Sequence, residues 1–170
     1  ILESGGVTDE PASREMNAGE NVGLPYFDLD KTRHRLLGGS STRWAGWCRP
    51  LDPMDLEKKD WVPHSGWPIS YDDLEPFYAE AEAGLGVSGE GTDDLGSPRS
   101  APYPMPAIPE SYLDKVFAGA LEETPYKVRP TPQARNSQDR DGRPPCCGSA
   151  SCIPVCPVQA PERTASAKAA

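Results

Sequence analysis

SYDDLEPFYAEAEAGLG, residues 70–86, carries the clearest helix signal in this chain. Ser70 predicts an N-cap because Asp73 follows three residues later, and Gly86 predicts the C-terminal end. Pro76 has no backbone N–H to donate, so the first turn is expected to be separate from the rest of the helix. The apolar side chains that recur at helical spacing on one face are Leu74, Phe77, Tyr78, Ala81 and Leu85.

Outside this segment the secondary-structure signals are fewer. A second amphipathic helix is predicted over residues 110–122, and residues 52–61 predict one or two helical turns. Residues 7–32 show no sustained period and are interpreted as loop. ILESGG (1–6) is typical of the end of a buried strand, and YKVRP (126–130) predicts a short strand. The apolar face of the second helix consists of Leu113, Val116, Phe117, Ala120 and Leu121.

The composition favours loops over long regular elements. The chain has 170 residues, the length of one domain, with 36% hydrophobic residues, 20 Pro and 16 Gly. With two modest helices and little strand, this predicts a loop-rich chain with a small core. The net charge of −9 argues against a nucleic-acid partner. No apolar run approaches the ~20 residues of a membrane-spanning helix. No initiator Met or secretory signal is present, so we expect the sequence to begin inside a longer protein.

Four of the five cysteines lie in PPCCGSASCIPVCP, residues 144–157. A structural zinc site usually shows two separated pairs of ligands, and a c-type haem needs C-x-x-C-H. Neither pattern is present. Disulfides are possible, although the cysteine count is odd and adjacent cysteines bond to each other only with strain. Cys48 stands apart from the cluster and is interpreted as a buried free thiol.

An iron–sulfur cluster fits this spacing better than the alternatives. Such a cluster needs three or four thiolates from one tight loop, and the ending C-x₃-C-P matches part of a known ferredoxin-type pattern. The small residues 148–151 allow the loop to curl, and their backbone N–H groups could donate to sulfides. The spacing alone leaves disulfides and zinc open.

Two shorter patterns are weak by themselves. In LLGGSST (36–42), Gly-Gly allows close approach of the backbone to a phosphate, and Ser hydroxyls can bind it. Glu3, at the end of the first predicted strand, is an acid of the kind that binds ribose hydroxyls in dinucleotide folds. Arg35 and Trp44 flank the glycines, and each could contact a cofactor. The ordinary interpretation is that the arginine is solvated and the tryptophan packs against its neighbours.

Together these segments resemble the glucose–methanol–choline family of flavoprotein oxidoreductases. ILESG resembles the second strand of that family's FAD-binding fold, and RLLGGSSTRWAG resembles its glycine motif beside the flavin. DWVPHSGWPISYDDLEPFYAEAEAGLGVSG resembles the segment that follows. SPRSAPYPMPAIP and ARNSQDRDGRPPCCGSASCIPVCP narrow the resemblance to the iron–sulfur branch, the catalytic subunits of bacterial FAD-dependent sugar dehydrogenases.

The resemblance implies a loop-rich α/β fold (an α+β fragment): an incomplete, Rossmann-like FAD-binding domain over residues 1–158, with an iron–sulfur loop at about 144–157. Residues 159–170 depart from the family and are expected to form a disordered tail. Glu3 is expected at the adenosine ribose. The implied ligands of a [3Fe–4S] cluster are Cys146, Cys152 and Cys156, with Cys147 beside it. The remaining residues expected to bind FAD are Arg35, Gly38, Gly39, Ser40, Ser41 and Trp44.

The implied activity is oxidation of a hydroxyl group of a sugar or sugar acid. Electrons would pass from FAD through the cluster to a cytochrome c subunit, in a periplasmic, membrane-associated complex that also contains a small subunit. The family's catalytic histidine belongs to a C-terminal portion that this chain does not contain. We therefore expect no catalytic residue here and no activity from the chain alone. The rival interpretation is a small non-enzymatic module for electron transfer or metal binding.

Overall fold

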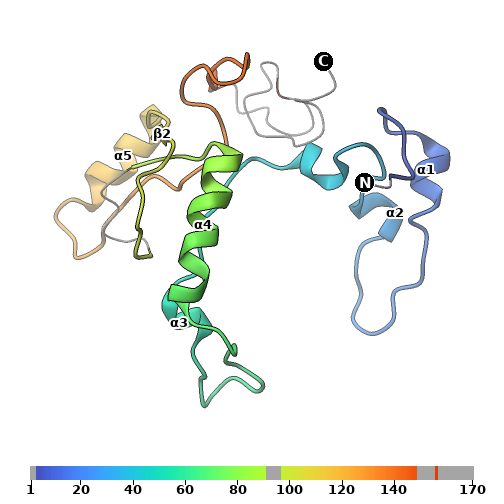
Figure 1. Cartoon of the computed structure of the whole chain (residues 1–170), viewed down its shortest axis with the longest axis horizontal. Coiled ribbons are helices and arrows are strands. Elements are labelled where there is room, and N and C mark those ends of the chain that lie inside the picture. The colour runs from blue at the N-terminus through green and yellow to red at the C-terminus, as the bar shows by residue number, and fades with distance from the viewer. Residues whose placement is uncertain (1–2, 91–96, 149–155, 157–170) are drawn as a thin grey trace. The chain divides into compact units, whose positions relative to one another are not determined.

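The computed structural model describes residues 3–90, 97–148 and Cys156 (Figure 1). These residues divide into two compact units. One contains residues 3–45 and Cys156, and the other contains residues 46–90 and 97–148. The predicted tail, residues 159–170, lies outside the described residues.

The first unit contains two short α-helices and one 3₁₀-helix. Helix α1 covers Pro11–Glu15, α2 covers Leu29–Thr32, and the 3₁₀-helix η1 covers Gly39–Arg43. The prediction of loop for residues 7–32 was therefore wrong in part. Helix α1 begins with Pro11, whose missing N–H costs nothing at a helix start. The described residues 3–6 form no strand, contrary to the expectation for ILESGG.

Within its described residues, the second unit contains three α-helices that begin with the same cap. Figure 1 labels their ribbons. Helix α3 covers Pro53–Leu56, α4 covers Tyr71–Leu85, and α5 covers Tyr112–Leu121. In each, an N-cap side chain accepts from a backbone N–H three residues on, and the acid there accepts from the N-cap N–H. The pairs are Asp52 with Asp55, Ser70 with Asp73, and Ser111 with Asp114. The predictions of these helices are confirmed.

Helix α4 runs through Pro76 without interruption, so the predicted separate first turn was wrong. The proline removes one backbone hydrogen bond. The capping box holds the first turn independently of that bond, with Ser70 N donating to Asp73 Oδ2 at 2.8 Å. Glu75 also connects this part of the helix to the segment around Ser100, because Ser100 N donates to its Oε1 at 2.7 Å. Gly86 ends the helix at φ 65°, as predicted.

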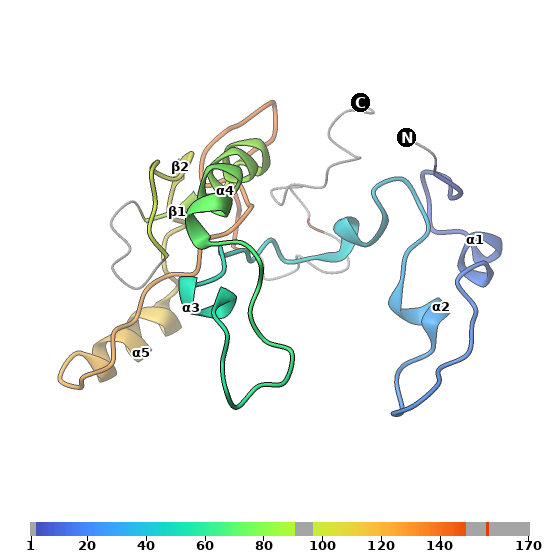
Figure 2. The ribbon, with the colours of Figure 1, turned by 60° about the horizontal axis from the view of Figure 1, so that its bottom comes forward.

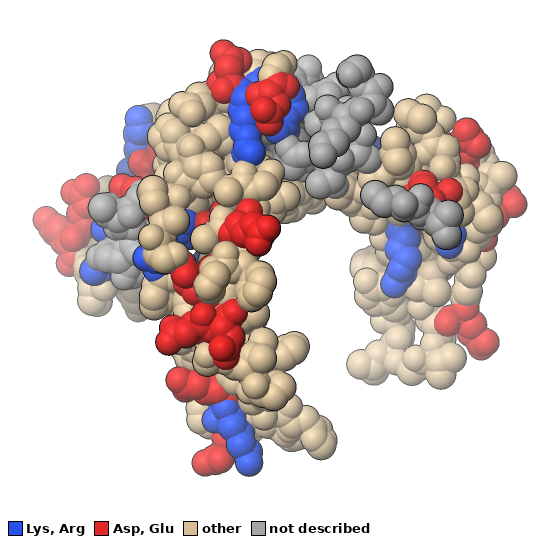
Figure 3. All heavy atoms as spheres, viewed as in Figure 1, with Lys and Arg blue, Asp and Glu red and all other residues tan. Residues whose placement is uncertain are grey.

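The buried face of α4 differs from the predicted one. Phe77 is 66% exposed, whereas Tyr71 and Glu82 are buried. Glu82 is buried because both of its oxygens accept from the Arg99 guanidinium, which also lies over the Tyr103 ring at 3.5 Å. Acidic side chains also follow the α4 segment in the space-filling view (Figure 3).

Short extended segments form the centre of the second unit. Strands β1 (Ser88–Gly89) and β2 (Met105–Pro106) pair in parallel, side by side in Figure 2. Gln133 forms antiparallel bridges with both Ser88 and Trp47. Four segments distant in sequence thus lie next to one another. The described residues show a loop-rich α/β arrangement, but 126–130 form no strand.

Few side chains are fully buried. In the second unit, Val87 is 1% exposed and Ala134 is 0% exposed, on adjacent extended segments. In the first unit, Leu36 is buried immediately before the glycine turn. None of the helices in the described ranges is long and apolar enough to cross a lipid bilayer.

Candidate functional site

The segment after Glu3 lies directly against the segment before the glycine turn. A Cβ placed on Gly5 would lie 2.0 Å from the carbonyl oxygen of Arg35, a separation that side chains do not adopt. One residue further on, Leu37 N donates to Gly6 O at 2.9 Å. The structure therefore places the segment that follows the predicted ribose-binding acid beside the residues that lead into the predicted phosphate-binding turn, although the two segments are distant in sequence.

The glycine turn has a backbone that favours glycine. Gly38 has φ 91° and Gly39 has φ 53°, both in the left-handed region. Gly39 N donates to Leu36 O at 2.7 Å, and helix η1 starts there. Ser41 Oγ donates back to Gly38 O at 2.5 Å. Ser40 lies in η1 near the start of this turn, and His34 N donates to its Oγ at 3.5 Å.

Arg35 joins three segments of the first unit. Its guanidinium donates to Ser4 Oγ at 2.7 Å, to Asn17 Oδ1 at 3.1 Å and to Met16 O at 3.3 Å. The residue predicted to contact the cofactor therefore holds the Ser4 segment in place. The exposed Glu3 accepts a hydrogen bond from Gly5 N at 2.8 Å. Trp44 is half-buried and follows η1 directly.

A charged cluster also lies within the first unit. Asp9 Oδ2 accepts from Arg14 at 2.9 Å and lies 3.3 Å from His34 Nδ1. The hydrogen bond from Arg14 holds the pKa of the Asp9 carboxyl below its ordinary value, and the charge of Arg14 and the nearby His34 act in the same direction. The carboxylate thus links α1 to the residue before Arg35.

The described cysteines are all unbridged thiols. Cys146 is half-buried, Cys147 is exposed and Cys156 is buried. Cys152, the third predicted cluster ligand, lies outside the described residues. Within the described ranges, no group of three or more His, Cys, Asp or Glu side chains is arranged to hold a metal ion. Cys48 is half-buried, and burial raises the pKa of its thiol.

Cys146 is held by backbone and side-chain contacts that sequence reasoning did not identify. Its N–H donates to Asn136 O at 2.8 Å, and its Sγ accepts from Arg135 Nη1 at 3.6 Å. The chain returns to Asn136 through a tight turn at Asp141 and Gly142, which have φ 49° and 74°. Positive φ at two adjacent central residues is what an Asp-Gly hairpin turn requires, so RDGR carried a turn signal that was missed.

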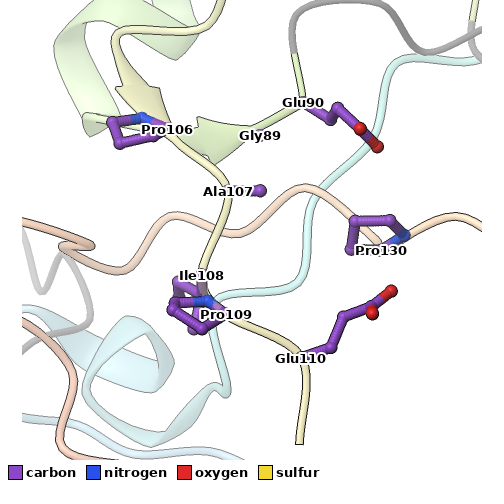
Figure 4. A pocket seen from close by; sticks show the side chains of 8 residues that line it. All are labelled: Gly89, Glu90, Pro106, Ala107, Ile108, Pro109, Glu110 and Pro130. Atoms are coloured by element: carbon purple, nitrogen blue, oxygen red, sulfur yellow. The ribbon is translucent and has the colours of Figure 1, made fainter. Parts of the chain in front are cut away.

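The second unit has a groove with a volume of about 450 Å³ beside the β1–β2 pair. The carboxylates of Glu90 and Glu110 lie on either side of Pro130 in Figure 4. None of the predicted FAD or cluster residues lines this groove. Its lining residues are Gly89, Glu90, Pro106, Ala107, Ile108, Pro109, Glu110 and Pro130.

Three curated proteins resemble the chain in sequence. The large subunit of fructose dehydrogenase from Gluconobacter japonicus is 37% identical over 127 residues, which is 73% of this chain and 23% of that protein. The 2-methyl-1,2-propanediol dehydrogenase of Mycolicibacterium austroafricanum is 32% identical over 110 residues, 63% of this chain and 20% of that protein. The gluconate 2-dehydrogenase flavoprotein of Pantoea cypripedii is 28% identical over 126 residues, 59% of this chain and 20% of that protein.

The three relatives are named as dehydrogenases, and one is named as a flavoprotein. The chain spans between a fifth and a quarter of their length. No family model matches the chain. The shared sequence thus lies within one portion of larger redox enzymes.

Proposed function

Because the chain belongs to the glucose–methanol–choline family of flavoprotein oxidoreductases, we propose that it supplies part of the FAD site of a dehydrogenase. The proposed substrate is a hydroxyl group of a sugar or sugar acid. The observation that carries this proposal is the 37% identity to the fructose dehydrogenase large subunit over 127 residues. When bound, FAD supplies the two-electron oxidation chemistry that protein side chains lack.

The geometry of the first unit fits a dinucleotide. Gly39, at φ 53°, keeps the backbone of the glycine turn free of side-chain atoms, which a closely bound ligand requires, while Gly5 lets the Glu3 segment pack against the backbone of Arg35. The exposed Glu3 would accept hydrogen bonds from the ribose, and Gly38 with the hydroxyls of Ser40 and Ser41 would face the phosphates. Arg35 holds the glutamate segment in place through Ser4, and Trp44 would lie near the flavin.

The cysteine loop is proposed to hold a [3Fe–4S] cluster through Cys146, Cys152 and Cys156. The donor chemistry fits, because the described cysteines are unbridged thiols and thiolates are the usual ligands of such clusters. Between the two adjacent cysteines, Cys146 is favoured as a ligand. It is half-buried and anchored to Asn136, while Cys147 is exposed.

We also propose that the full-length protein transfers electrons to a cytochrome c subunit and associates with a small subunit. Its proposed location is periplasmic and membrane-associated. The large-subunit name of the Gluconobacter relative supports the expectation of further subunits. The acidic net charge of −9 suits an electron-transfer partner with a basic surface.

Dye reduction by the full-length protein that contains this chain tests the substrate class. Fructose, gluconate and 2-methyl-1,2-propanediol represent the three relatives, and we expect turnover with a sugar or sugar acid. Turnover of the diol alone would reject the sugar assignment. A purified full-length protein without flavin would reject the dehydrogenase proposal itself.

Single Cys→Ser variants of the full-length protein test the ligand assignment. Electron paramagnetic resonance of the oxidised protein is expected to lose the cluster signal in Cys146→Ser, Cys152→Ser and Cys156→Ser, and to keep it in Cys147→Ser. Loss in Cys147→Ser with retention in Cys146→Ser would reverse the assignment. Loss in all four variants would indicate a four-thiolate [4Fe–4S] site.

A further inference from the structure

We propose that Arg135 is a positioning residue for Cys146, and that its guanidinium raises the reduction potential of the iron–sulfur cluster. This inference rests on the cluster proposed above. Arg135 Nη1 donates to Cys146 Sγ at 3.6 Å, in a part-buried contact between residues eleven positions apart. The contact places the positive charge of the guanidinium next to the sulfur.

The segment that carries Arg135 is fixed on both of its edges. Ala134, which is fully buried, donates from its N–H to Gly46 O at 2.7 Å. On the other edge, Ser88 Oγ donates to the carbonyl oxygen of Arg135 at 2.6 Å. These bonds come from two different segments of the chain, and together they leave the backbone of Arg135 little freedom to shift.

The side chain of Arg135 is also guided toward the cysteine. A Cβ on Gly46 would lie 2.9 Å from Arg135 Cγ, so the absence of a side chain at Gly46 lets the arginine stem lie across it. The side-chain oxygen of Gln133 accepts a hydrogen bond from Arg135 Nη2. The guanidinium fork thus has one branch on Gln133 and the other on the Cys146 sulfur.

Cys146 is anchored to the residue next to Arg135. Its N–H donates to the carbonyl oxygen of Asn136 at 2.8 Å, and Asn136 is only 1% exposed. The Asn136 side chain donates to Arg143 O at 3.0 Å, which holds the returning part of the hairpin. The separation between the guanidinium and the sulfur is therefore set by a short chain of backbone bonds.

The direction of the effect follows from charge. One-electron reduction of a cluster adds a negative charge that spreads onto the ligand sulfurs, and no bond is formed or broken. A cationic donor at one sulfur stabilises the reduced form more than the oxidised form. Hydrogen bonds to ligand sulfurs are among the features that set cluster potentials. Removal of the Arg135 charge is therefore expected to favour the oxidised cluster.

The test is a potentiometric reduction of the full-length holoprotein with dithionite, followed by electron paramagnetic resonance. In Arg135→Gln we expect the cluster to remain and its reduction equilibrium to shift about tenfold toward the oxidised form, about 59 mV for one electron. Arg135→Lys, which keeps the charge, is expected to recover most of the shift. Arg129→Gln removes the same charge from an exposed residue of the same unit and is expected to leave the potential unchanged.

A cluster-loaded Arg135→Gln protein with an unchanged potential would overturn the inference and leave the proposed function intact. If that variant holds too little iron to measure, the potential is measured in Arg135→Met, which keeps the aliphatic part of the side chain but not the charge. A shifted potential would then support the inference, and an unchanged potential would overturn it. Iron lost in both neutral variants but retained in Arg135→Lys would support the inference. Iron lost in all three would assign Arg135 to packing and overturn it. A wild-type holoprotein with flavin but no cluster would instead reject the proposed cluster.

Discussion

Gly5 shows how a single residue determines whether two distant segments meet. Its missing side chain leaves space that the carbonyl group of Arg35 occupies, and a Cβ there would lie 2.0 Å from that oxygen. The position was not predicted, because ILESGG identifies a turn but not its neighbour in space. Glu3 was predicted to bind ribose from its place at the end of a predicted strand, and Gly5, two residues later, lets this segment pack against the backbone of Arg35.

Gly5→Ala is expected to separate the Glu3 segment from the glycine turn in the full-length protein. The added methyl group clashes with backbone atoms that cannot move independently, and overpacking of this kind costs about 1–3 kcal/mol. We expect a lower flavin content per protein and a lower thermal midpoint. Gly84→Ala is the matched control, because Gly84 lies within α4 with no atom within 4 Å of its added Cβ. Normal flavin content in Gly5→Ala would contradict the proposed site.

Glu82→Gln is expected to destabilise the second unit by up to about 3 kcal/mol, because it leaves the part-buried Arg99 guanidinium without its charged partner. The side chains of Glu82 and Arg99 are 11% and 14% exposed. Hydrogen bonding to Glu82 raises the pKa of Arg99. Arginine also keeps its charge without this partner, so the variant leaves a cation unpaired in a partly buried position. Chemical unfolding measures the difference. Glu80→Gln, an exposed acid on the same helix, is the control, and an equal effect from both variants would refute the role of the ion pair.

At the scale of elements, the helix ends were predictable and the helix faces were not. Ser70 and Ser111 each precede an acid by three residues, a local signal that is complete within the sequence. The buried face of α4 depends on Arg99, which lies seventeen residues from Glu82, and apolar periodicity contains no information about that partner. Pro76 was misjudged for a similar reason, because the capping box compensates for the lost bond.

The cap of α4 is expected to weaken in acid. Hydrogen bonds from the Ser70 hydroxyl and N–H lower the pKa of Asp73 below its ordinary value of 3.8. A folded pKa below the unfolded one means that the stabilisation is present above about pH 4 and is lost as the pH falls through the lowered value. The pH dependence of thermal unfolding between pH 5 and pH 2 should be shallower in Asp73→Asn. Asp72→Asn, in the same turn, is the control, and identical profiles for the two variants would disprove this role.

At the scale of the whole molecule, the central pairing of the second unit could not be predicted from sequence. Gln133 pairs with both Trp47 and Ser88, and each pairing joins segments more than forty residues apart. The two strands have two residues each and the bridges are single residue pairs, so an alternating apolar pattern cannot be recognised in the sequence. The cysteine spacing could be recognised in the sequence. The anchoring of Cys146 could not, because it depends on this pairing of distant segments.

The 170-residue chain alone is expected not to oxidise fructose, glucose or gluconate. It spans less than a quarter of each curated relative, and the substrate-binding and catalytic portions are proposed to lie in the remainder. A dye-reduction assay of the isolated chain, loaded with excess FAD, should show no rate above the blank. Turnover in that assay would show that the chain is a complete catalyst.

The proposed cofactors are tested most directly by the visible absorption spectrum of the full-length protein purified without oxygen. We predict flavin bands together with the broad absorption of an iron–sulfur cluster, and about three irons for each flavin. Reduction by the sugar substrate should bleach both. A protein that shows flavin bands without iron would contradict the cluster, and one that shows neither would contradict the central claim that this chain is part of an FAD- and iron–sulfur-dependent dehydrogenase.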